Sequence, residues 1–131
     1  MKAAYKFADF TSACAIGVEA VHVIKGATIT ARSDFNLKTN GEILGFISNG
    51  GLENLGYIKT KPWKNDPKSS GIMVDSYNFY SGDTKGYMAY LYQPETKKWL
   101  LKSFKKDNPS GVKNLPFKGL KQMLKSEGGV K

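Results

Sequence analysis

The chain has 131 residues, of which 40% are hydrophobic, and a formal net charge of +9. This length and apolar content suit a single domain over residues 1–131, and no apolar run approaches the ~20 residues of a membrane-spanning helix. Lys6 and Asp9 interrupt the apolar stretch that a secretory signal would need. We therefore expect a cytoplasmic protein that does not bind membranes.

The single cysteine and the single histidine exclude several kinds of chemistry. Cys14 cannot form an internal disulfide, and its apolar neighbours favour a buried structural thiol. With His22 as the only histidine, the usual zinc sites and a two-histidine ribonuclease mechanism are excluded. His22 lies between two valines, which favours a partly buried structural role. We expect no metal and no other cofactor.

The N-terminal half of the sequence predicts mainly helices. Residues 5–16 suit a helix, and residues 18–24, rich in β-branched side chains, suit either a strand or the end of that helix. Residues 27–32 alternate in the manner of a short strand. Thr39 or Asn40 should cap a further helix, which ends at the Asn-Gly-Gly sequence that follows it.

The middle of the chain is expected to be irregular. A short helical turn is predicted at residues 52–55, and residues 59–71 are polar and interrupted by two prolines. We interpret the second stretch as an exposed loop. Such loops often carry function, because a rigid scaffold holds them while their backbone faces water.

The C-terminal half predicts an antiparallel meander of three strands, residues 72–80, 86–92 and 98–104, joined by turn-rich segments. Simple alternation in the last strand would place on one face Trp99, Leu101 and Ser103, and on the other Leu100, Lys102 and Phe104. Residues 117–125 predict a short amphipathic helix. The expected fold class is α+β: N-terminal helices, an antiparallel sheet of three to four strands, and a short C-terminal helix.

The positive charge is concentrated at one end of the chain. Residues 97–131 carry ten lysines and two acidic residues, whereas residues 1–96 carry ten basic and nine acidic residues. The lysine-rich segment 105–131 is typical of a protein that binds a polyanion, nucleic acid first, although a solvated tail would show the same composition.

Lysines, tyrosines and one tryptophan are the candidate functional residues. Lysines bind phosphates and aromatic rings stack on unpaired bases, a combination suited to single-stranded RNA. The candidates for catalysis are Lys59, Lys61, Lys105, Tyr87 and Tyr90. The candidates for RNA binding are Trp63, Lys64, Tyr77, Lys102 and Lys106. For any single strand tyrosine, packing in the core is the competing interpretation.

Cleavage of RNA without a metal requires three groups. One removes the proton of the 2′-hydroxyl, one stabilises charge on the phosphate, and one protonates the leaving 5′-oxygen. Clustered lysines could supply the first two groups and a tyrosine the third.

The order of a capped helix, a lysine-bearing loop and three strands ending in Lys102-Ser103-Phe104-Lys105-Lys106 resembles the RelE/MqsR-type ribonuclease toxins. The resemblance spans about residues 30–107. It implies a RelE- or barnase-like fold and places functional residues at Lys105, at Lys59 or Lys61, and at Tyr87 or Tyr90. A glutamine of the MqsR pattern has no counterpart near Val74 or Asp75.

The resemblance implies a metal-independent endoribonuclease toxin that cleaves mRNA or tRNA, inhibits growth and is neutralised by a cognate antitoxin or immunity protein. Similar domains occur in toxin–antitoxin and contact-dependent inhibition systems, and a delivered toxin would act in the cytosol of a target cell. Two alternatives stay open: a non-catalytic nucleic-acid-binding protein, phage-encoded or accessory, and an antitoxin, immunity or inhibitor protein.

Overall fold

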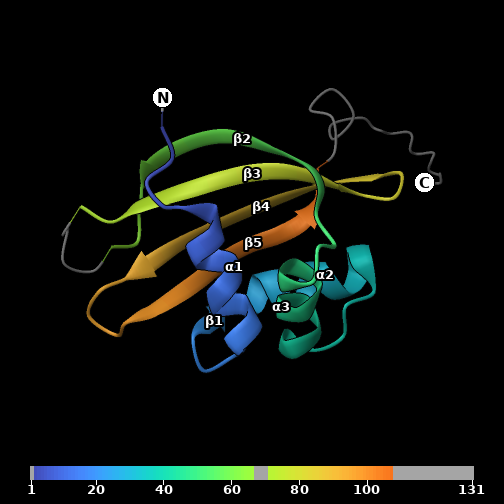
Figure 1. Ribbon diagram of the computed structural model, residues 1–131, viewed down its shortest axis with the longest axis horizontal. Coiled ribbons are helices and arrows are strands. Elements are labelled where there is room, and N and C mark those ends of the chain that lie inside the picture. Colours follow the sequence, from blue (N-terminus) through green and yellow to red (C-terminus); the bar gives the residue numbers. More distant parts are fainter. Residues whose placement is uncertain (1, 67–70, 108–131) are drawn as a thin grey trace.

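Three helices pack against one face of a five-stranded sheet in the computed structural model, which describes residues 2–66 and 71–107 (Figure 1). Along the chain the elements are α1 (Phe7–Ile16), β1 (Val21–Val23), α2 (Lys25–Phe35), α3 (Asn40–Ser48), β2 (Glu53–Pro62), β3 (Met73–Ser81), β4 (Thr84–Gln93) and β5 (Lys98–Lys106). The expected α+β class is confirmed. The predicted C-terminal helix and most of segment 105–131 lie outside the described residues.

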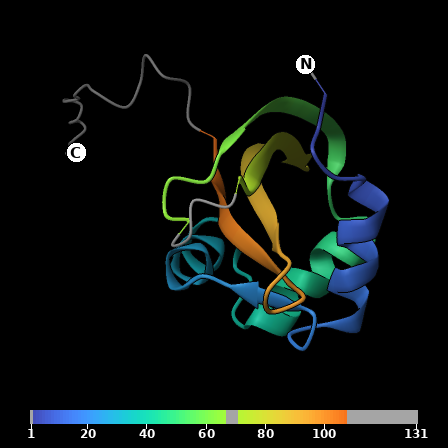
Figure 2. The same cartoon turned by 90° about the vertical axis from the view of Figure 1, so that its left-hand side faces the viewer.

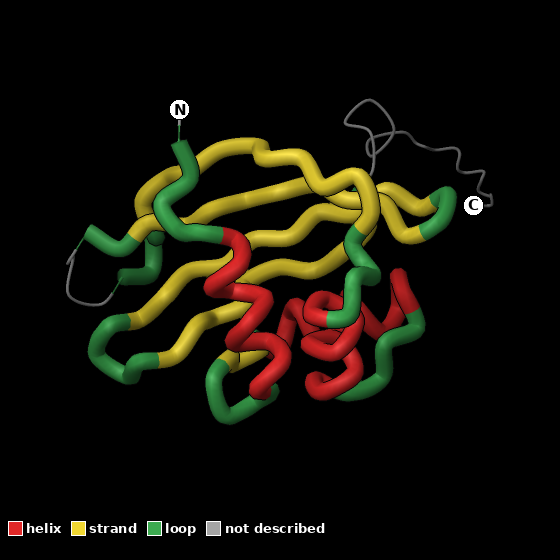
Figure 3. The backbone as a smooth tube through the Cα atoms, in the orientation of Figure 1, coloured by secondary structure: helices red, strands yellow, loops and turns green. Residues whose placement is uncertain are grey.

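The sheet has the strand order β1-β5-β4-β3-β2. Strands β2 to β5 form the predicted antiparallel meander, extended by one strand, and β1 joins its far edge parallel to β5. The sheet curves around α1 and α3, and α2 lies alongside β5, to whose backbone its side chains form hydrogen bonds (Figures 2 and 3). The opposite side of the sheet carries no helix in the described chain, and we call it the open face.

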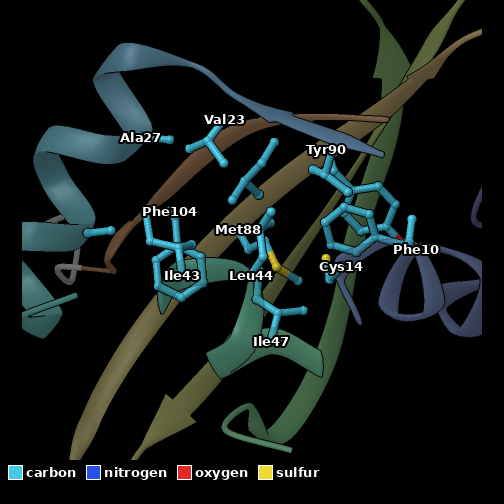
Figure 4. Close-up of a cluster of buried hydrophobic side chains, with 14 of the residues drawn as sticks. Phe10, Cys14, Val23, Ala27, Ile43, Leu44, Ile47, Met88, Tyr90 and Phe104 are labelled. Carbon is cyan, nitrogen blue, oxygen red and sulfur yellow. The ribbon is translucent and has the colours of Figure 1, made fainter. Parts of the chain in front are cut away.

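The main core fills the space between the helices and the sheet (Figure 4). At its centre the rings of Phe10 and Tyr90, both fully buried, stack with centroids 3.9 Å apart. Burial of each such side chain contributes roughly 1.5–3 kcal/mol to stability. The helices supply Phe10, Ala13, Cys14, Ala27, Ala31, Ile43, Leu44 and Ile47, and the sheet supplies Val21, Val23, Tyr77, Phe79, Met88, Tyr90, Leu101 and Phe104.

Residues 27–32 lie in helix α2, so the predicted strand is wrong there. Ala27 and Ala31, one turn apart, are both buried, and these small side chains let the helix approach β5 closely. The Thr30 hydroxyl donates a 2.7 Å hydrogen bond to the carbonyl oxygen of Phe104 on that strand. Tertiary packing therefore overrides the β propensity of the local sequence.

The capped helix is confirmed as α3. The Thr39 side chain accepts a 3.0 Å hydrogen bond from the Glu42 amide, and the Glu42 carboxylate accepts a 2.7 Å bond from the Lys38 amide. The first bond satisfies an amide of the first helical turn, which has no partner within the helix, and the second fixes the residue before the cap.

Strand β2 replaces two of the expected irregular segments. It begins at Glu53, so the helical turn predicted at 52–55 is wrong, and it runs through Lys59 and Lys61 to Pro62, so the first part of the predicted loop is a strand. Pro62 is tolerated because β2 lies at the edge of the sheet. In the described chain no helix is long and apolar enough to cross a membrane.

A β-bulge in β5 changes the expected alternation of its side chains. Tyr90 pairs with Leu101 and Ala89 with Ser103, so Lys102 is the extra residue on β5. As a result, Leu101 and Phe104 both face the helices, and Lys102, Ser103 and Lys105 are free of the core. Strict alternation through this strand is therefore wrong.

The chain before α1 is fixed to the sheet by Asp75, which is fully buried. Its two carboxylate oxygens accept hydrogen bonds from the amides of Ala4 (2.9 Å) and Tyr5 (3.0 Å), and the Thr60 hydroxyl donates a third bond of 2.5 Å. Because each bond involves a charged acceptor, this arrangement compensates for removing the carboxylate from water.

Candidate functional site

The open face presents two neighbouring rows of side chains across the sheet. One row runs through Lys59, Ser76, Ala89 and Ser103, which are paired in that order from β2 to β5. The next row joins Asn78, Tyr87 and Lys105. Paired residues of adjacent strands have Cβ atoms roughly 4.5–5.5 Å apart on the same face. Side chains from four strands therefore converge on one surface.

A cavity of about 200 Å³ is formed between this face and the end of β2. We call it the small cavity. Its lining comprises Lys61, Pro62, Lys64, Asn65, Val74, Ser76, Tyr87, Ala89 and Lys102. Val74 and Ala89 are buried and form an apolar floor, whereas Lys61, Lys64 and Asn65 are exposed at its rim.

A wider hollow of about 520 Å³ adjoins it, and we call it the charged hollow. It is lined by Asp34, Tyr87, Lys102, Ser103, Lys105, Lys106 and Asp107. Tyr87 and Lys102 line both spaces, so the two are continuous around these side chains. Its three lysines outnumber its two aspartates, and this excess of positive charge attracts phosphates.

Lys105 is positioned by an aromatic ring. Its ammonium nitrogen lies 5.7 Å from the centroid of the Tyr87 ring, and the two residues are directly paired across β4 and β5. A cation at this distance is attracted to the negative face of the ring. The contact orients an exposed lysine side chain without neutralising its charge.

Two carboxylates fix the end of β5. The Asp34 carboxylate accepts a 2.9 Å hydrogen bond from the Lys106 amide, and Asp107 lies 3.9 Å from the ammonium group of Lys85. The Asp107 amide also donates to the carbonyl oxygen of Lys85. These bonds hold the strand that carries Lys102 and Lys105.

The structure brings together six of the ten candidate residues proposed from the sequence. The two spaces are lined by Lys61, Lys64, Tyr87, Lys102, Lys105 and Lys106. Lys59 belongs to the same face, in the row of Ser76 and Ala89, but it does not line either space; its carbonyl oxygen accepts a hydrogen bond from the Ser76 hydroxyl. Trp63 is half-buried against the apolar cluster that includes Val74 and Leu91, so it packs on this face.

Tyr77 and Tyr90 lie on the other side of the sheet, in the core with the helices. Burial raises the pKa of both hydroxyl groups, which keeps them protonated. Of the three candidate tyrosines, Tyr87 alone lies on the open face, where it lines both spaces. In a strand side chains alternate between faces, and Tyr87 and Tyr90 are separated by an odd number of positions.

Some residues of the site escaped the sequence analysis. Ser76 and Asn65 line the small cavity, and alternation along β3 could have placed Ser76 opposite the core residues. His22 is exposed and pairs with Leu100 on β1, so the expected partial burial is wrong. Among the residues that the structure describes, no group of three or more His, Cys, Asp and Glu is placed to hold a metal ion.

Comparison of the chain with protein-family models, curated proteins and solved structures returns no match.

Proposed function

We propose that the protein binds RNA on its open face and cleaves it there as a metal-independent endoribonuclease toxin. The observation that carries this proposal is the convergence of Lys61, Lys102 and Lys105 around Tyr87. These residues come from three strands and line one continuous surface. Lysines on such a surface bind successive phosphates, and the tyrosine ring offers a face to a base.

The same residues meet the requirements of cleavage by the 2′-hydroxyl. The 2′-oxygen attacks phosphorus and the bond to the 5′-oxygen breaks, which leaves a cyclic phosphate and a free 5′-hydroxyl. Lys61 or Lys105 would act as the base for the 2′-hydroxyl, and the Tyr87 hydroxyl would donate a proton to the leaving oxygen. Lys102, held by the bulge, would stabilise the charge on the phosphate.

The resemblance to RelE/MqsR-type toxins supports the same assignment. It pointed to Lys105, to Lys59 or Lys61, and to Tyr87 or Tyr90, and of the two tyrosines Tyr87 lies on the open face. The substrate would be mRNA or tRNA in the cytoplasm, or in the cytosol of a target cell. A cognate antitoxin or immunity protein would neutralise the activity by covering this basic face with acidic residues.

The test is incubation of total cellular RNA with the purified protein in EDTA. The wild type and Lys98→Ala should release discrete fragments, and Lys105→Ala should release none while it keeps the wild-type melting temperature. Lys98 is the matched control because it is an exposed lysine at the opposite end of β5.

Cleavage by Lys105→Ala at the wild-type rate would refute the site. Intact RNA that shifts in a gel at low salt would leave a non-catalytic nucleic-acid-binding protein. Intact RNA without a shift would refute RNA as the ligand.

A further inference from the structure

We infer that the small cavity binds one unpaired nucleobase while the charged hollow binds the neighbouring phosphates, so that the substrate class is single-stranded RNA. This inference rests on the proposed function and specifies how its ligand lies on the open face.

The floor of the small cavity suits an uncharged, flat group, although Lys61, Lys64 and Lys102 also line the cavity. Val74 and Ala89 form its floor and are 5% and 2% exposed, and the ring of Tyr87 stands at its side. An apolar floor disfavours a phosphate, because a charge placed on it loses its water without gaining hydrogen bonds. A base loses little there and can contact the aromatic ring.

The size of the small cavity points the same way. About 200 Å³ holds several water molecules, each of which occupies ~30 Å³ in the liquid, and is smaller than the ~300–1,000 Å³ of pockets that hold drug-sized ligands. One ring system fits this space better than a whole nucleotide. At the rim, the amide side chain of Asn65 is exposed and can exchange hydrogen bonds with a base edge.

The charged hollow differs from the small cavity in having no aliphatic floor. Its lining is polar or charged at almost every position: Lys102, Lys105 and Lys106 provide ammonium groups for phosphate oxygens, beside the carboxylates of Asp34 and Asp107. Because Tyr87 and Lys102 line both spaces, a base in the small cavity would have its own backbone phosphate at the border between them. The arrangement thus fixes which part of a nucleotide lies on each side of Tyr87.

A base can enter the small cavity only after it leaves its stack. In a double helix each base is paired and stacked, so a duplex would have to open at a cost of a few kcal/mol. Loops and unpaired strands present bases without this cost, and sequence-specific RNA recognition mostly uses them.

The test measures affinity for two strands of six 2′-O-methyl residues, which the attack of a 2′-hydroxyl cannot cleave. One strand is abasic throughout, and the other carries a single adenine or uracil at its centre. Base stacking on an aromatic side chain should make the base-bearing strand bind the wild type about tenfold more tightly.

Ala89→Leu should abolish this tenfold difference, because the larger side chain fills the small cavity from its floor, and should leave the affinity for the abasic strand unchanged. Ala8→Leu makes the same change at an exposed alanine of helix α1, outside both spaces; it is the matched control and should bind like the wild type. Asn65→Ala changes an exposed side chain at the rim, and it should reduce the preference for the base-bearing strand as well.

Equal affinity of the wild type for the two strands would overturn the base-binding inference and leave RNA binding intact. A tenfold difference that persists both in a folded Ala89→Leu variant and in Asn65→Ala would also overturn the base-binding inference. Failure to bind either strand would overturn the proposed function together with the inference.

Discussion

Removal of three lysines from the open face should change how RNA binding depends on salt. The perturbation is the triple variant Lys61→Gln, Lys102→Gln and Lys105→Gln, which keeps long polar side chains and removes three positive charges. A lysine that binds a phosphate releases a counterion, and for single strands each contact contributes ~0.7 to the slope of log affinity against log salt concentration.

The structure sets the size of the effect. All three lysines line the small cavity or the charged hollow. If each binds one phosphate, the slope should become shallower by about 2. A control variant with Lys6→Gln, Lys25→Gln and Lys38→Gln loses the same charge from exposed positions on the helices and the segments next to them. It should keep the wild-type slope.

The assay is fluorescence anisotropy of a labelled 2′-O-methyl hexanucleotide at several potassium chloride concentrations. Equal slopes for the two triple variants would show that net charge, and not this surface, governs binding. An unchanged slope in the site variant would show that its lysines do not contact phosphates. Either result would refute the reasoning.

Two further predictions concern stability. Asp75→Asn leaves one acceptor oxygen in place of two and turns an NH₂ group toward the buried amides. The free energy of unfolding, measured in urea, should therefore fall by about 1–3 kcal/mol. An unchanged urea midpoint would contradict the role of Asp75. Burial raises the pKa of the Cys14 thiol to about 12. The thiol of the unfolded chain titrates at about pH 8.5. The contribution of the buried, protonated thiol to the free energy of unfolding is therefore complete below that pH and should fall by roughly 1 kcal/mol per pH unit above it. Urea unfolding at pH 7, 9 and 10 should show this loss in the wild type and not in Cys14→Ala, and parallel curves for the two proteins would contradict it.

The meander and the capped helix were predictable because their signals are local. Strands β3, β4 and β5 are separated by turn sequences, and Thr39 stands before an apolar periodic segment. Helix α2 was not predictable from its own residues. Its alternating sequence favours a strand, and its helical state depends on contacts with β5, which lies far along the chain.

The candidate site was only partly predictable for a related reason. Lysines near strand ends could be found by composition, but the face on which each side chain lies depends on register. The bulge at Lys102 shifts that register by one residue, and nothing in the residues of β5 alone marks it. The same dependence explains why Tyr87 and Tyr90 remained alternatives until the strands were paired.

The parallel pairing of β1 with β5 also determines when the protein can fold. Val21 pairs with Trp99, so β1 cannot complete its pairing until β5 has been synthesised. The helices emerge first and cannot bury their apolar sides until β4 and β5 are complete, which gives folding a high contact order. Lys102 and Lys105 lie on β5. A nascent chain therefore lacks the proposed RNA-binding surface until β5 has been synthesised, and acquires it in the same step that closes the core.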